Sequence, residues 1–586
     1  MRPLLRLRPY LARYRTTLLW GLVTVVMSNV FNVALPLFVG RAIDELKAGL
    51  QSGALDKSGI LMYALLVIGF SLVAGVFTFL TRQTIIVVSR HVEFDIRNDF
   101  LAHIQKLPLA YFQNTPTGEL MALATNDISA VRNALGPGIM YPTDTMMTFI
   151  MVLSVMLWAD WQLTLLALIP LPFVSVAVYY LGKLVHRKFE ERQAQYSALT
   201  TRAQENLSGI RVIKTYVREE YETARFRAMS WDYLRKNLVL ARVQSIMWPL
   251  MFLLIGFSLV ITLYYGGMRV MDARLSIGTL TAFFGYQVML IWPMIAFGWV
   301  INQLQQGAAS MARLTRTMDT EPEIRDTAQT DRSITSLTGT IEFRNVTFSH
   351  RGAAVPALQD IALTIPAGRT LAVVGYTGSG KSTLVNLIPR MYDVTGGQLL
   401  IDGVDVRKIP LDVLRGSIGY VPQETFLFSE TIEENIAYGA EGATEADIRE
   451  AAEIARIARD VAEFPKGYET MLGERGITLS GGQKQRTSIA RAVMRKPAIL
   501  ILDDALSAVD TFTEEGILSR LRGVMKGRTS IIISHRISTV KDADAIIVLD
   551  GGRIKERGTH DELVALGGIY AELHRKQLLE EELEQL

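Results

Sequence analysis

The sequence of 586 residues contains no cysteine, which excludes disulfide bonds, thiolate metal sites and a cysteine nucleophile but does not fix the cellular compartment. Charge of either sign is in little excess: the formal net charge is +3 and no long basic tract occurs, so nucleic-acid binding is not indicated. Hydrophobic residues nevertheless make up 49%, the mean hydropathy is +0.23, and 20% of residues are charged. We therefore expect one membrane-embedded part and one soluble part.

Long apolar runs are absent from the second half of the chain and frequent in the first. A helix needs about 20 apolar residues to cross the hydrocarbon of a membrane. Six runs of this kind are predicted to span: Thr16–Gly40, Ser58–Thr81, Leu135–Ala159, Trp161–Gly182, Val243–Met268, and a last one from Ser276 up to Arg313. The first is too long for the apolar region of a secretion signal, so we interpret it as a retained span.

The charges that flank these runs predict the orientation. Five arginines precede the first run, which places the N-terminus in the cytoplasm by the positive-inside rule. The third and fourth spans form a tight hairpin around Asp160, whereas the connections after the second and fourth spans are long, charged and helical in pattern. We therefore expect a multi-pass protein of the cell (inner) membrane, with the part after Arg313 in the cytoplasm.

From Gly339 onward the pattern changes to short β-branched strands, glycine-rich turns and amphipathic helices, which is typical of an α/β domain. Three parts are predicted. Residues 1–320 form an α-helical transmembrane domain of six spanning helices with long cytoplasmic extensions, residues 321–338 are a polar linker, and residues 339–586 form an α/β P-loop nucleotide-binding domain.

A glycine-rich motif follows a buried strand that ends at Gly375 and precedes a helix. It matches G-x-x-x-x-G-K-[ST], in which backbone N–H groups surround phosphates, Lys381 reaches the outer phosphates and the Ser382 hydroxyl binds Mg²⁺. The expected nucleotide-binding residues here are Gly375, Thr377, Gly378, Ser379, Gly380, Lys381, Ser382 and Thr383. A chance glycine-rich turn is the alternative, but the flanking strand and helix argue against it.

Two further features point to the same chemistry. The apolar run 498–502 ends in Asp503, as expected of a buried strand that places a carboxylate at a metal ion. Residues Ser480, Gly481, Gly482 and Gln483 precede an amphipathic helix and form a second phosphate-binding shape. One nucleotide cannot easily use both shapes, so we infer that nucleotides are shared between two chains.

Together these motifs resemble the ATP-binding cassette family, and the order of membrane domain before cassette is similar to its exporter branch. The resemblance covers essentially the whole chain. It implies a Q-loop at Gln423, an X-loop at residues 473–476, a D-loop at residues 507–510 and a switch histidine at His535. It also implies that Gln423 is a ligand of the metal ion. It therefore implies that ATP and Mg²⁺ are the cofactors.

Two segments of the membrane half, Tyr111–Glu119 and Glu205–Lys214, resemble the family's two intracellular coupling segments. Each lies where the pattern predicts a turn in a long cytoplasmic connection, and each alone could be an ordinary helix break. The resemblance implies that ATP closes two cassettes together and that these segments pass the movement to the membrane domain.

Two residues depart from the family pattern. Asp504 stands where the family usually has glutamate as general base, and its shorter side chain would miss the attacking water by about an ångström, which can cost roughly a hundredfold in rate. Such chains are typically subunits of heterodimers, so we expect a slow ATP site in this chain and a homologous partner that carries the glutamate. The alternative is a homodimer in which Asp504 suffices.

The second departure is His350, which stands where the family usually has a tyrosine that stacks on adenine. An imidazole ring can also stack on a base.

The resemblance implies ATP-driven export of hydrophobic or amphipathic, multidrug-type compounds by one half of a dimeric transporter. A flippase for lipids or lipid A is the alternative, and a peptide substrate remains open. An ATP-gated channel is a further rival, which would show ATP-dependent current without uphill accumulation of a substrate. Asn29, Asn32 and Asp144 lie in or near predicted spans. They could line a cavity, because polar groups usually avoid lipid, or could equally pair between helices.

Overall fold

The computed structural model describes residues 2–52, 57–473, 476, 479–509 and 511–584. The chain forms two compact units. The first comprises Met1–Ala102 and Gly118–Asp319, and the second comprises His103–Thr117 and Thr320–Leu586. The short segment His103–Thr117 therefore leaves the helical unit and packs with the C-terminal one.

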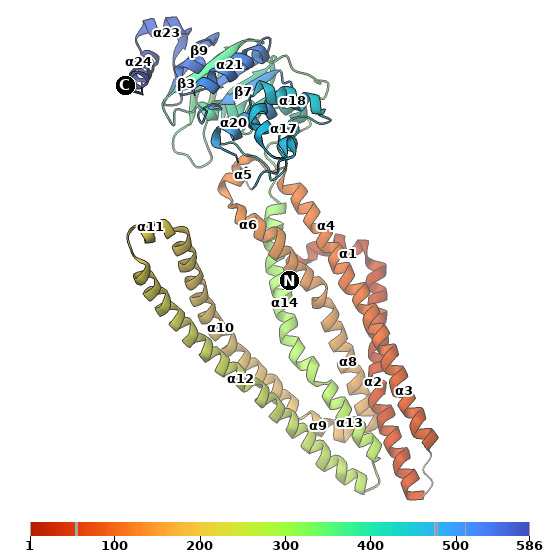
Figure 1. Cartoon of the computed structure of the whole chain (residues 1–586). Coiled ribbons are helices and arrows are strands. Elements are labelled where there is room, and N and C mark those ends of the chain that lie inside the picture. Colours follow the sequence, from red (N-terminus) through yellow and green to blue (C-terminus); the bar gives the residue numbers. More distant parts are fainter. Residues whose placement is uncertain (1, 53–56, 474–475, 477–478, 510, 585–586) are drawn as a thin grey trace. The chain divides into compact units, whose positions relative to one another are not determined.

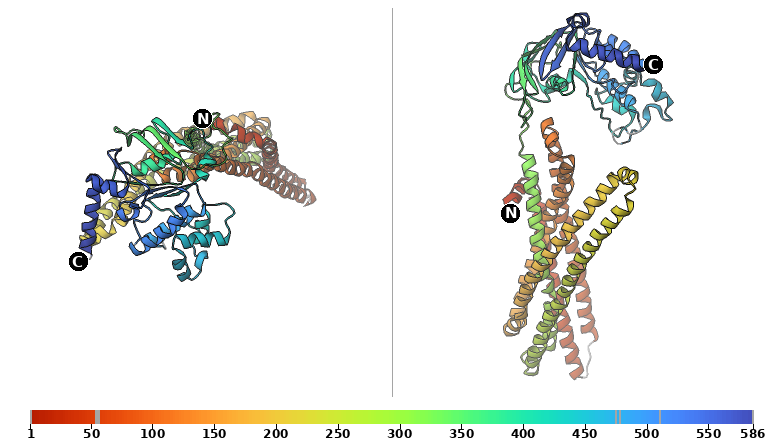
Figure 2. Two further views of the ribbon diagram at one scale, coloured as in Figure 1. Left: turned by 90° about the horizontal axis from the view of Figure 1, so that it is seen from above. Right: turned by 90° about the vertical axis from the view of Figure 1, so that its left-hand side faces the viewer.

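The first unit consists of helices. In chain order they are the 3₁₀ helix Arg2–Leu7, α1 (Arg8–Arg13), α2 (Arg15–Ser52), α3 (Lys57–Thr81), a π-helical turn (Arg82–Ile86), α4 (Val87–Ile104), α6 (Thr117–Ala122), a second π-helical turn (Leu123–Asp127), α7 (Ile128–Leu135), α8 (Pro137–Ala159), α9 (Trp161–Leu168), α10 (Pro170–Ser208), α11 (Ile210–Thr215), α12 (Glu219–Met271), α13 (Ile277–Met289) and α14 (Ile291–Met318). Figures 1 and 2 show α10 and α12 running side by side over most of their length.

Helices cover all six predicted spans, but not all of them are continuous. Four helical stretches of the described residues are long and apolar enough to cross a membrane: Arg15–Gln51, Ser58–Ile104, Thr117–Ala159 and Glu219–Met271. The expected fourth and sixth spans are each divided, at Ile169 and at Leu290. Pro170 and Pro293 follow these breaks closely, and because proline has no N–H, each removes a hydrogen bond of the helical ladder.

The predicted hairpin around Asp160 is present between α8 and α9. The Asp160 carboxylate accepts hydrogen bonds from the backbone N–H groups of Gln162 and Leu163, at 3.0 and 2.9 Å, and so caps α9. It also forms an ion pair with Arg269 near the end of α12. The capping carboxylate thus connects the hairpin to the fifth span.

Helices α2 and α13 approach each other unusually closely at two glycines. A Cβ atom on Gly278 would lie 1.9 Å from the carbonyl oxygen of Gly40, so neither position has room for a side chain. One turn further along α2, the Asp44 carboxylate accepts hydrogen bonds from Gly278 N (2.8 Å) and Ser276 Oγ (2.6 Å). The backbones of the first and sixth spans are therefore in close contact, and the Asp44 side chain joins them by hydrogen bonds.

The second unit is an α/β domain with two sheets. The strands are β1 (Ile341–Phe348), β2 (Leu358–Ile365), β3 (Thr370–Gly375), β4 (Gly396–Ile401), β5 (Val404–Asp405), β6 (Ile418–Val421), β7 (Ile499–Asp503), β8 (Thr529–Ile533), β9 (Ala545–Asp550) and β10 (Arg553–Gly558). The smaller sheet has the order β2-β1-β4-β5 and is antiparallel. The larger has the order β10-β9-β3-β8-β7-β6 and is parallel except for β10.

The helices of this unit surround the sheets. They are α5 (Leu109–Asn114), α15 (Lys381–Leu387), α16 (Leu411–Gly416), α17 (Ile432–Ala437), α18 (Glu445–Ile454), α19 (Ala458–Glu463), a 3₁₀ turn (Gly467–Glu469), α20 (Gly481–Met494), α21 (Thr511–Met525), α22 (Ile537–Val540), α23 (His560–Leu566) and α24 (Ile569–Glu584). Two apolar clusters form the core. Residues of β3, β7 and β8 contribute to both, which explains why these strands read as uninterrupted apolar runs.

Residues 321–338, which precede β1, form neither helix nor strand. They are fixed to the cassette at their C-terminal end by Asp402, whose carboxylate accepts from the backbone N–H groups of Thr338, Gly339 and Thr340. The pKa of Asp402 is held below its usual range, because these hydrogen bonds outweigh the effect of its partial burial.

Candidate nucleotide-binding site

The parallel sheet brings the predicted nucleotide residues to one edge. Ile533, at the end of β8, is aligned with Asp503 of β7 on one side and with Val373 of β3 on the other, and Val421 of β6 is aligned with Leu502 of β7. Because parallel strands share one carboxyl edge, the segments after them emerge together. These are the loop after Gly375, Gln423 after β6, Asp504 after β7 and His535 after β8.

The loop after β3 needs glycine at two positions. The φ of Gly375 is +146°, and a Cβ there would lie 2.1 Å from the carbonyl oxygen of Leu549. The φ of Gly380 is +101°, and a Cβ would lie 2.7 Å from the carbonyl oxygen of Ala357. Both positions exclude side chains, so the loop's shape depends on these glycines.

The lysine of the loop is directed into the loop. Lys381 is only 7% exposed, and its Nζ donates hydrogen bonds to the carbonyl oxygens of Gly375 (2.9 Å) and Tyr376 (2.8 Å). Burial lowers the pKa of this amine, and the carboxylates of Asp503 and Asp504 oppose the shift. The hydroxyl of Ser379, also buried, has no hydrogen-bond partner among the described residues. A buried cation and an unsatisfied hydroxyl in one glycine-rich loop suit an anionic ligand such as a phosphate.

The residues expected to bind Mg²⁺ meet beside this loop. Ser382 Oγ donates a hydrogen bond of 3.2 Å to Asp503 Oδ1 at the end of β7, and Asp503 is 2% exposed. Burial raises the pKa of the Asp503 carboxyl. The hydrogen bond from Ser382 lowers this pKa, and the nearby charge of Asp504 raises it further. One hydroxyl and one buried carboxylate fit Mg²⁺, which binds few protein oxygens and completes its shell with water and phosphate oxygens.

Asp504 has an unusual backbone conformation that the sequence did not reveal. Its φ is +49°, in the left-handed region, where aspartate is found more often than most residues. The conformation is fixed by a hydrogen bond from Asp504 N to Ile533 O (2.9 Å) and by one from Ser507 Oγ to Asp504 O (3.0 Å). The side chain is partly exposed at the strand edge, and His535 and Gln423, at the same edge, are exposed.

The second phosphate-binding shape lies at the start of α20. Ser480 Oγ accepts from Gln483 N (3.2 Å) while Gln483 Oε1 accepts from Ser480 N (2.9 Å), a reciprocal helix cap. Gln483 Nε2 also donates to Asp460 Oδ1, so both ends of this amide are engaged within the chain. Ser480 and Gly481 are exposed, and Gly482 lies close to Ala508.

Gln485 is a structural residue of this region that sequence reasoning missed. Its Oε1 accepts from Ala508 N (2.9 Å) and its Nε2 donates to Ser507 Oγ (3.0 Å), so it ties the D-loop to α20. The only sequence signal is its place within an amphipathic helix, where a polar residue on the inner face needs partners. Of the predicted X-loop and D-loop, Glu474, Arg475 and Asp510 lie outside the described residues.

His350 lies in an aromatic group after β1. Its ring is edge-on to Phe348 and Tyr392, at centroid distances of 4.8 and 5.4 Å, and the residue itself is exposed. Tyr392 is in turn hydrogen-bonded by the side chain of Gln113, which belongs to α5. One aromatic side chain therefore separates His350 from the first predicted coupling segment.

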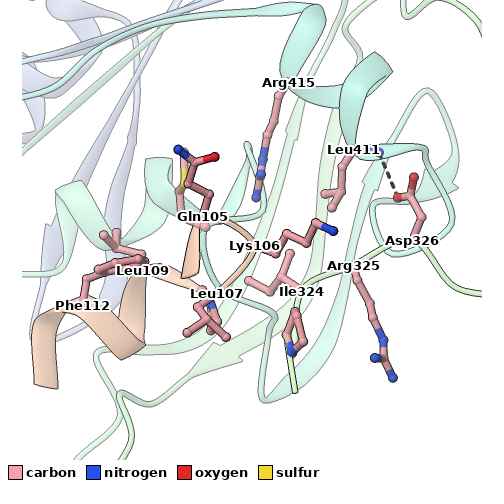
Figure 3. Close-up of a pocket in the computed structure, with 13 residues that line it drawn as sticks. Gln105, Lys106, Leu107, Leu109, Phe112, Ile324, Arg325, Asp326, Leu411 and Arg415 are labelled. Carbon is pink, nitrogen blue, oxygen red and sulfur yellow. Dashed lines mark hydrogen bonds between the residues drawn. The ribbon is translucent and has the colours of Figure 1, made fainter. Parts of the chain in front are cut away.

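The first predicted coupling segment, up to Thr117, and the residues just before it belong to the cassette unit, whereas Gly118 and Glu119 belong to the helical unit. Ala110 of α5 contacts the core cluster that includes β1 and β3, and Leu107 is buried. Beside them lies a hollow of about 680 Å³, lined on one side by residues 105–109, which precede the segment, and by Phe112, and on the other by residues that include Ile324 and Arg415 (Figure 3).

The second predicted coupling segment forms the turn between α10 and α12. It contains α11, and an ion pair between Arg202 and Glu222 joins the two long helices near it. Apolar side chains are exposed at this turn, among them Leu207, Tyr216 and Val217 at 75%, 72% and 81%. The predicted turn is confirmed.

A helical membrane unit and a cassette with a phosphate loop, a buried strand-end acid and a second phosphate-binding turn define a membrane transporter driven by nucleotide. Comparison with known families agrees. The model of the ABC transporter transmembrane region matches residues 18–294, and the model of the ABC transporter cassette matches residues 358–507. The chain belongs to the ABC transporter family and is an ATP-hydrolysing transporter.

Individual relatives match over almost their full length. The probable multidrug resistance ABC transporter ATP-binding/permease protein YheI of Bacillus subtilis (strain 168) is 40% identical over 95% of this chain and 95% of its own. The ATP-dependent lipid A-core flippase of Syntrophus aciditrophicus (strain SB) is 35% identical over 98% and 94%. The solved structure of a bacterial Atm1-family ABC exporter with ATP bound superposes with a TM-score of 0.80, at 29% identity, over 96% of this chain and 99% of that one. The exporter fold expected from the sequence is confirmed.

Proposed function

We propose that this chain is one half of a heterodimeric exporter of hydrophobic or amphipathic compounds, and that the ATP site built on its own phosphate loop is the slow one. The observation that carries the heterodimer is Asp504 in the place of the usual glutamate. The exporter class is supported by the fold, and the multidrug type by relatives such as YheI and the multidrug resistance-like ATP-binding protein MdlA of Escherichia coli (strain K12), which is 34% identical over 99% of this chain.

The residues at the sheet edge take separate roles in this proposal. The loop from Gly375 to Thr383 binds the phosphates of ATP, with Lys381 as the cation on the outer ones, and His350 contacts the base. Ser382, Asp503 and Gln423 hold Mg²⁺, which when bound neutralises charge on those phosphates. The geometry that supports this is the short distance between Ser382 and Asp503 and the burial of both Lys381 and Asp503.

Hydrolysis also needs a group that orients and deprotonates the attacking water. In this chain Asp504 is the available carboxylate and His535 the exposed imidazole at the same edge. Asp504 accepts the water's proton, but its side chain is one methylene shorter than the usual base, so its reach is reduced. The exposed Ser480 and Gly481 are proposed to contact the nucleotide that the partner holds, where the partner's glutamate is the faster base.

The proposed setting is the cell (inner) membrane, with the N-terminus and the cassette in the cytoplasm. Five arginines before the first predicted span, which begins at Thr16, support this orientation by the positive-inside rule. The partner is a homologous half-transporter with a glutamate after its strand-end aspartate.

The test has two arms. The tagged chain, isolated from its native membrane in mild detergent, should carry a second, homologous chain in a 1:1 ratio by mass spectrometry. Expressed alone and reconstituted in nanodiscs, it should hydrolyse ATP about a hundredfold more slowly than the isolated complex. Rapid, cooperative hydrolysis by the chain alone, together with a single subunit type in the native complex, would establish the homodimer instead.

A lipid flippase is the second candidate, because several relatives that are 34–36% identical are ATP-dependent lipid A-core flippases. Proteoliposomes separate the two functions. An exporter of amphipathic compounds accumulates a dye in inside-out vesicles on addition of ATP, whereas a flippase moves a fluorescently labelled lipid between leaflets without dye accumulation.

A further inference from the structure

The helical unit contains a hollow of about 700 Å³ between α2, α8 and α13. Its walls are mainly apolar and include Leu35, Phe284 and Val288. Its polar groups lie on α2, α8 and α13: Asn29, Asn32, Asp144, Thr148 and Thr281. A mainly apolar hollow with a few polar groups has the composition of a small-molecule site.

The one acidic side chain among these residues is held in place by its neighbours. Asn29 Nδ2 donates to Asp144 Oδ1 at 2.8 Å and to the carbonyl oxygen of Val25 at 3.0 Å. Thr148 Oγ1 donates to the Asn29 oxygen, so the amide can present only its N–H side to Asp144. Asn29 is 3% exposed, which fixes this arrangement inside the helix packing.

The charge of Asp144 is not balanced by a nearby cation. Among the described residues no cation is found to act on Asp144, and none of the residues that line the hollow is lysine, arginine or histidine. A carboxylate in a membrane span is costly, and such groups usually face a cavity and pair with a charge or a substrate. A helix contact alone would need only a neutral acceptor for Asn29, such as another amide.

We propose that this hollow binds the cationic group of an amphipathic substrate, with Asp144 as its counter-charge and the apolar walls in contact with the hydrophobic part. The inference rests on the proposed exporter function and adds the charge class of its substrate. An anionic headgroup, such as a lipid phosphate, would meet a charge of its own sign in the hollow. The proposal thus also weighs against a flippase for anionic lipids.

The test uses two ions of almost equal size and shape and opposite charge, tetraphenylphosphonium and tetraphenylborate. Their binding to the complete transporter, in neutral detergent without nucleotide, is measured by isothermal titration calorimetry. We expect the wild-type protein to bind the cation more tightly than the anion. Asp144→Asn keeps the shape of the side chain and an acceptor for Asn29 but removes the charge, so its affinity for the cation should fall about tenfold.

Two further variants serve as controls. Asp272→Asn removes a carboxylate at an exposed position that does not line the hollow, and it should leave the preference for the cation unchanged. Asp144→Glu retains the charge and should retain the preference for the cation. If Asp144→Asn fails to fold, the comparison of the two ions on the wild-type protein and on Asp144→Glu carries the test.

Equal binding of both ions by the wild-type protein, or undiminished cation binding by folded Asp144→Asn, would overturn the proposal. That failure is distinct from a failure of the exporter function, which is measured separately as ATP-driven dye accumulation in inside-out vesicles. A protein that accumulates neutral amphipathic dyes but shows no charge preference is an exporter whose Asp144 acts only between helices.

Discussion

The phosphate loop and the turn at Ser480–Gln483, which we call the signature turn, are both glycine-rich turns that precede a helix, yet their surroundings differ. In the loop, Lys381 is buried and bonded to two carbonyl groups, and Ser382 is joined to the strand-end Asp503. In the turn, Ser480 and Gly481 are exposed and the cap is completed by Gln483 alone. The loop thus has its own cation and acid, whereas the turn offers only outward-facing donors. In the proposed dimer, one chain would therefore carry one nearly complete nucleotide site and half of another.

The strongest test of this difference is Gly481→Asp. Its Cβ would lie 3.4 Å from Ala508 Cβ, an ordinary contact, and an acidic residue in the first turn favours a helix, so α20 should fold normally. The new carboxylate would face the phosphates held by the partner. We expect steady-state ATP hydrolysis by the assembled transporter to fall by about a hundredfold, with an unchanged thermal unfolding midpoint.

The matched change on the loop side is Asp504→Asn, which keeps the shape of the side chain. In the heterodimer it should lower turnover only modestly, because the partner's site carries most of the hydrolysis. In a homodimer every working site needs both residues, so both changes would be severe. If Asp504→Asn is as damaging as Gly481→Asp, the proposed division between the two regions is wrong.

Lys381→Ala acts on the loop alone and should have an intermediate effect. It removes the cation from the outer phosphates, so ATP binding at this chain's own site should weaken about tenfold. Photolabelling with an azido-ATP analogue, followed by separation of the two chains, measures each site independently. Lys526→Ala, at an exposed lysine of the same domain, is the control. Unchanged labelling of this chain in Lys381→Ala would contradict the assignment of the loop.

The smallest effect is expected at His350. Replacement by tyrosine enlarges the ring available to adenine, and ATP affinity at this chain's site should rise about two- to threefold; His350→Ala should lower it. The signature turn does not contact this base, so labelling of the partner chain should stay constant. A change confined to the partner chain would show that His350 is not part of the loop's site.

Much of the site could be predicted because it depends on local rules. A buried apolar run that ends in a glycine-rich turn or an aspartate indicates a strand and the loop after it, and parallel strands bring such ends together. The left-handed backbone of Asp504 could not be predicted, because hydrogen bonds to Ile533 and Ser507 impose it. The sequence left open whether Asn29 and Asp144 line a cavity or pair between helices, and the structure shows both; which residues pair could not be predicted, since 115 residues separate these two.

In the membrane unit, the length and composition of the apolar runs predicted where six segments lie, but not whether each segment is one continuous helix. The breaks at Ile169 and Leu290 lie within apolar runs, where hydropathy is the same on both sides. Only the prolines signal them, and the continuous α2 and α12 also contain prolines, Pro36 and Pro249. Whether a proline divides a helix depends on what replaces the missing hydrogen bond, which is a property of the packing.

The contact between Gly40 and Gly278 has a mechanical consequence. Two backbones without intervening side chains cannot slide past one another without steric collision, and the Asp44 carboxylate adds hydrogen bonds at the same point. We therefore expect α2 and α13 to move together. Because the sixth span is divided at Leu290, we expect any bending of that span to fall between α13 and α14, so that α13 stays with α2 when α14 changes direction.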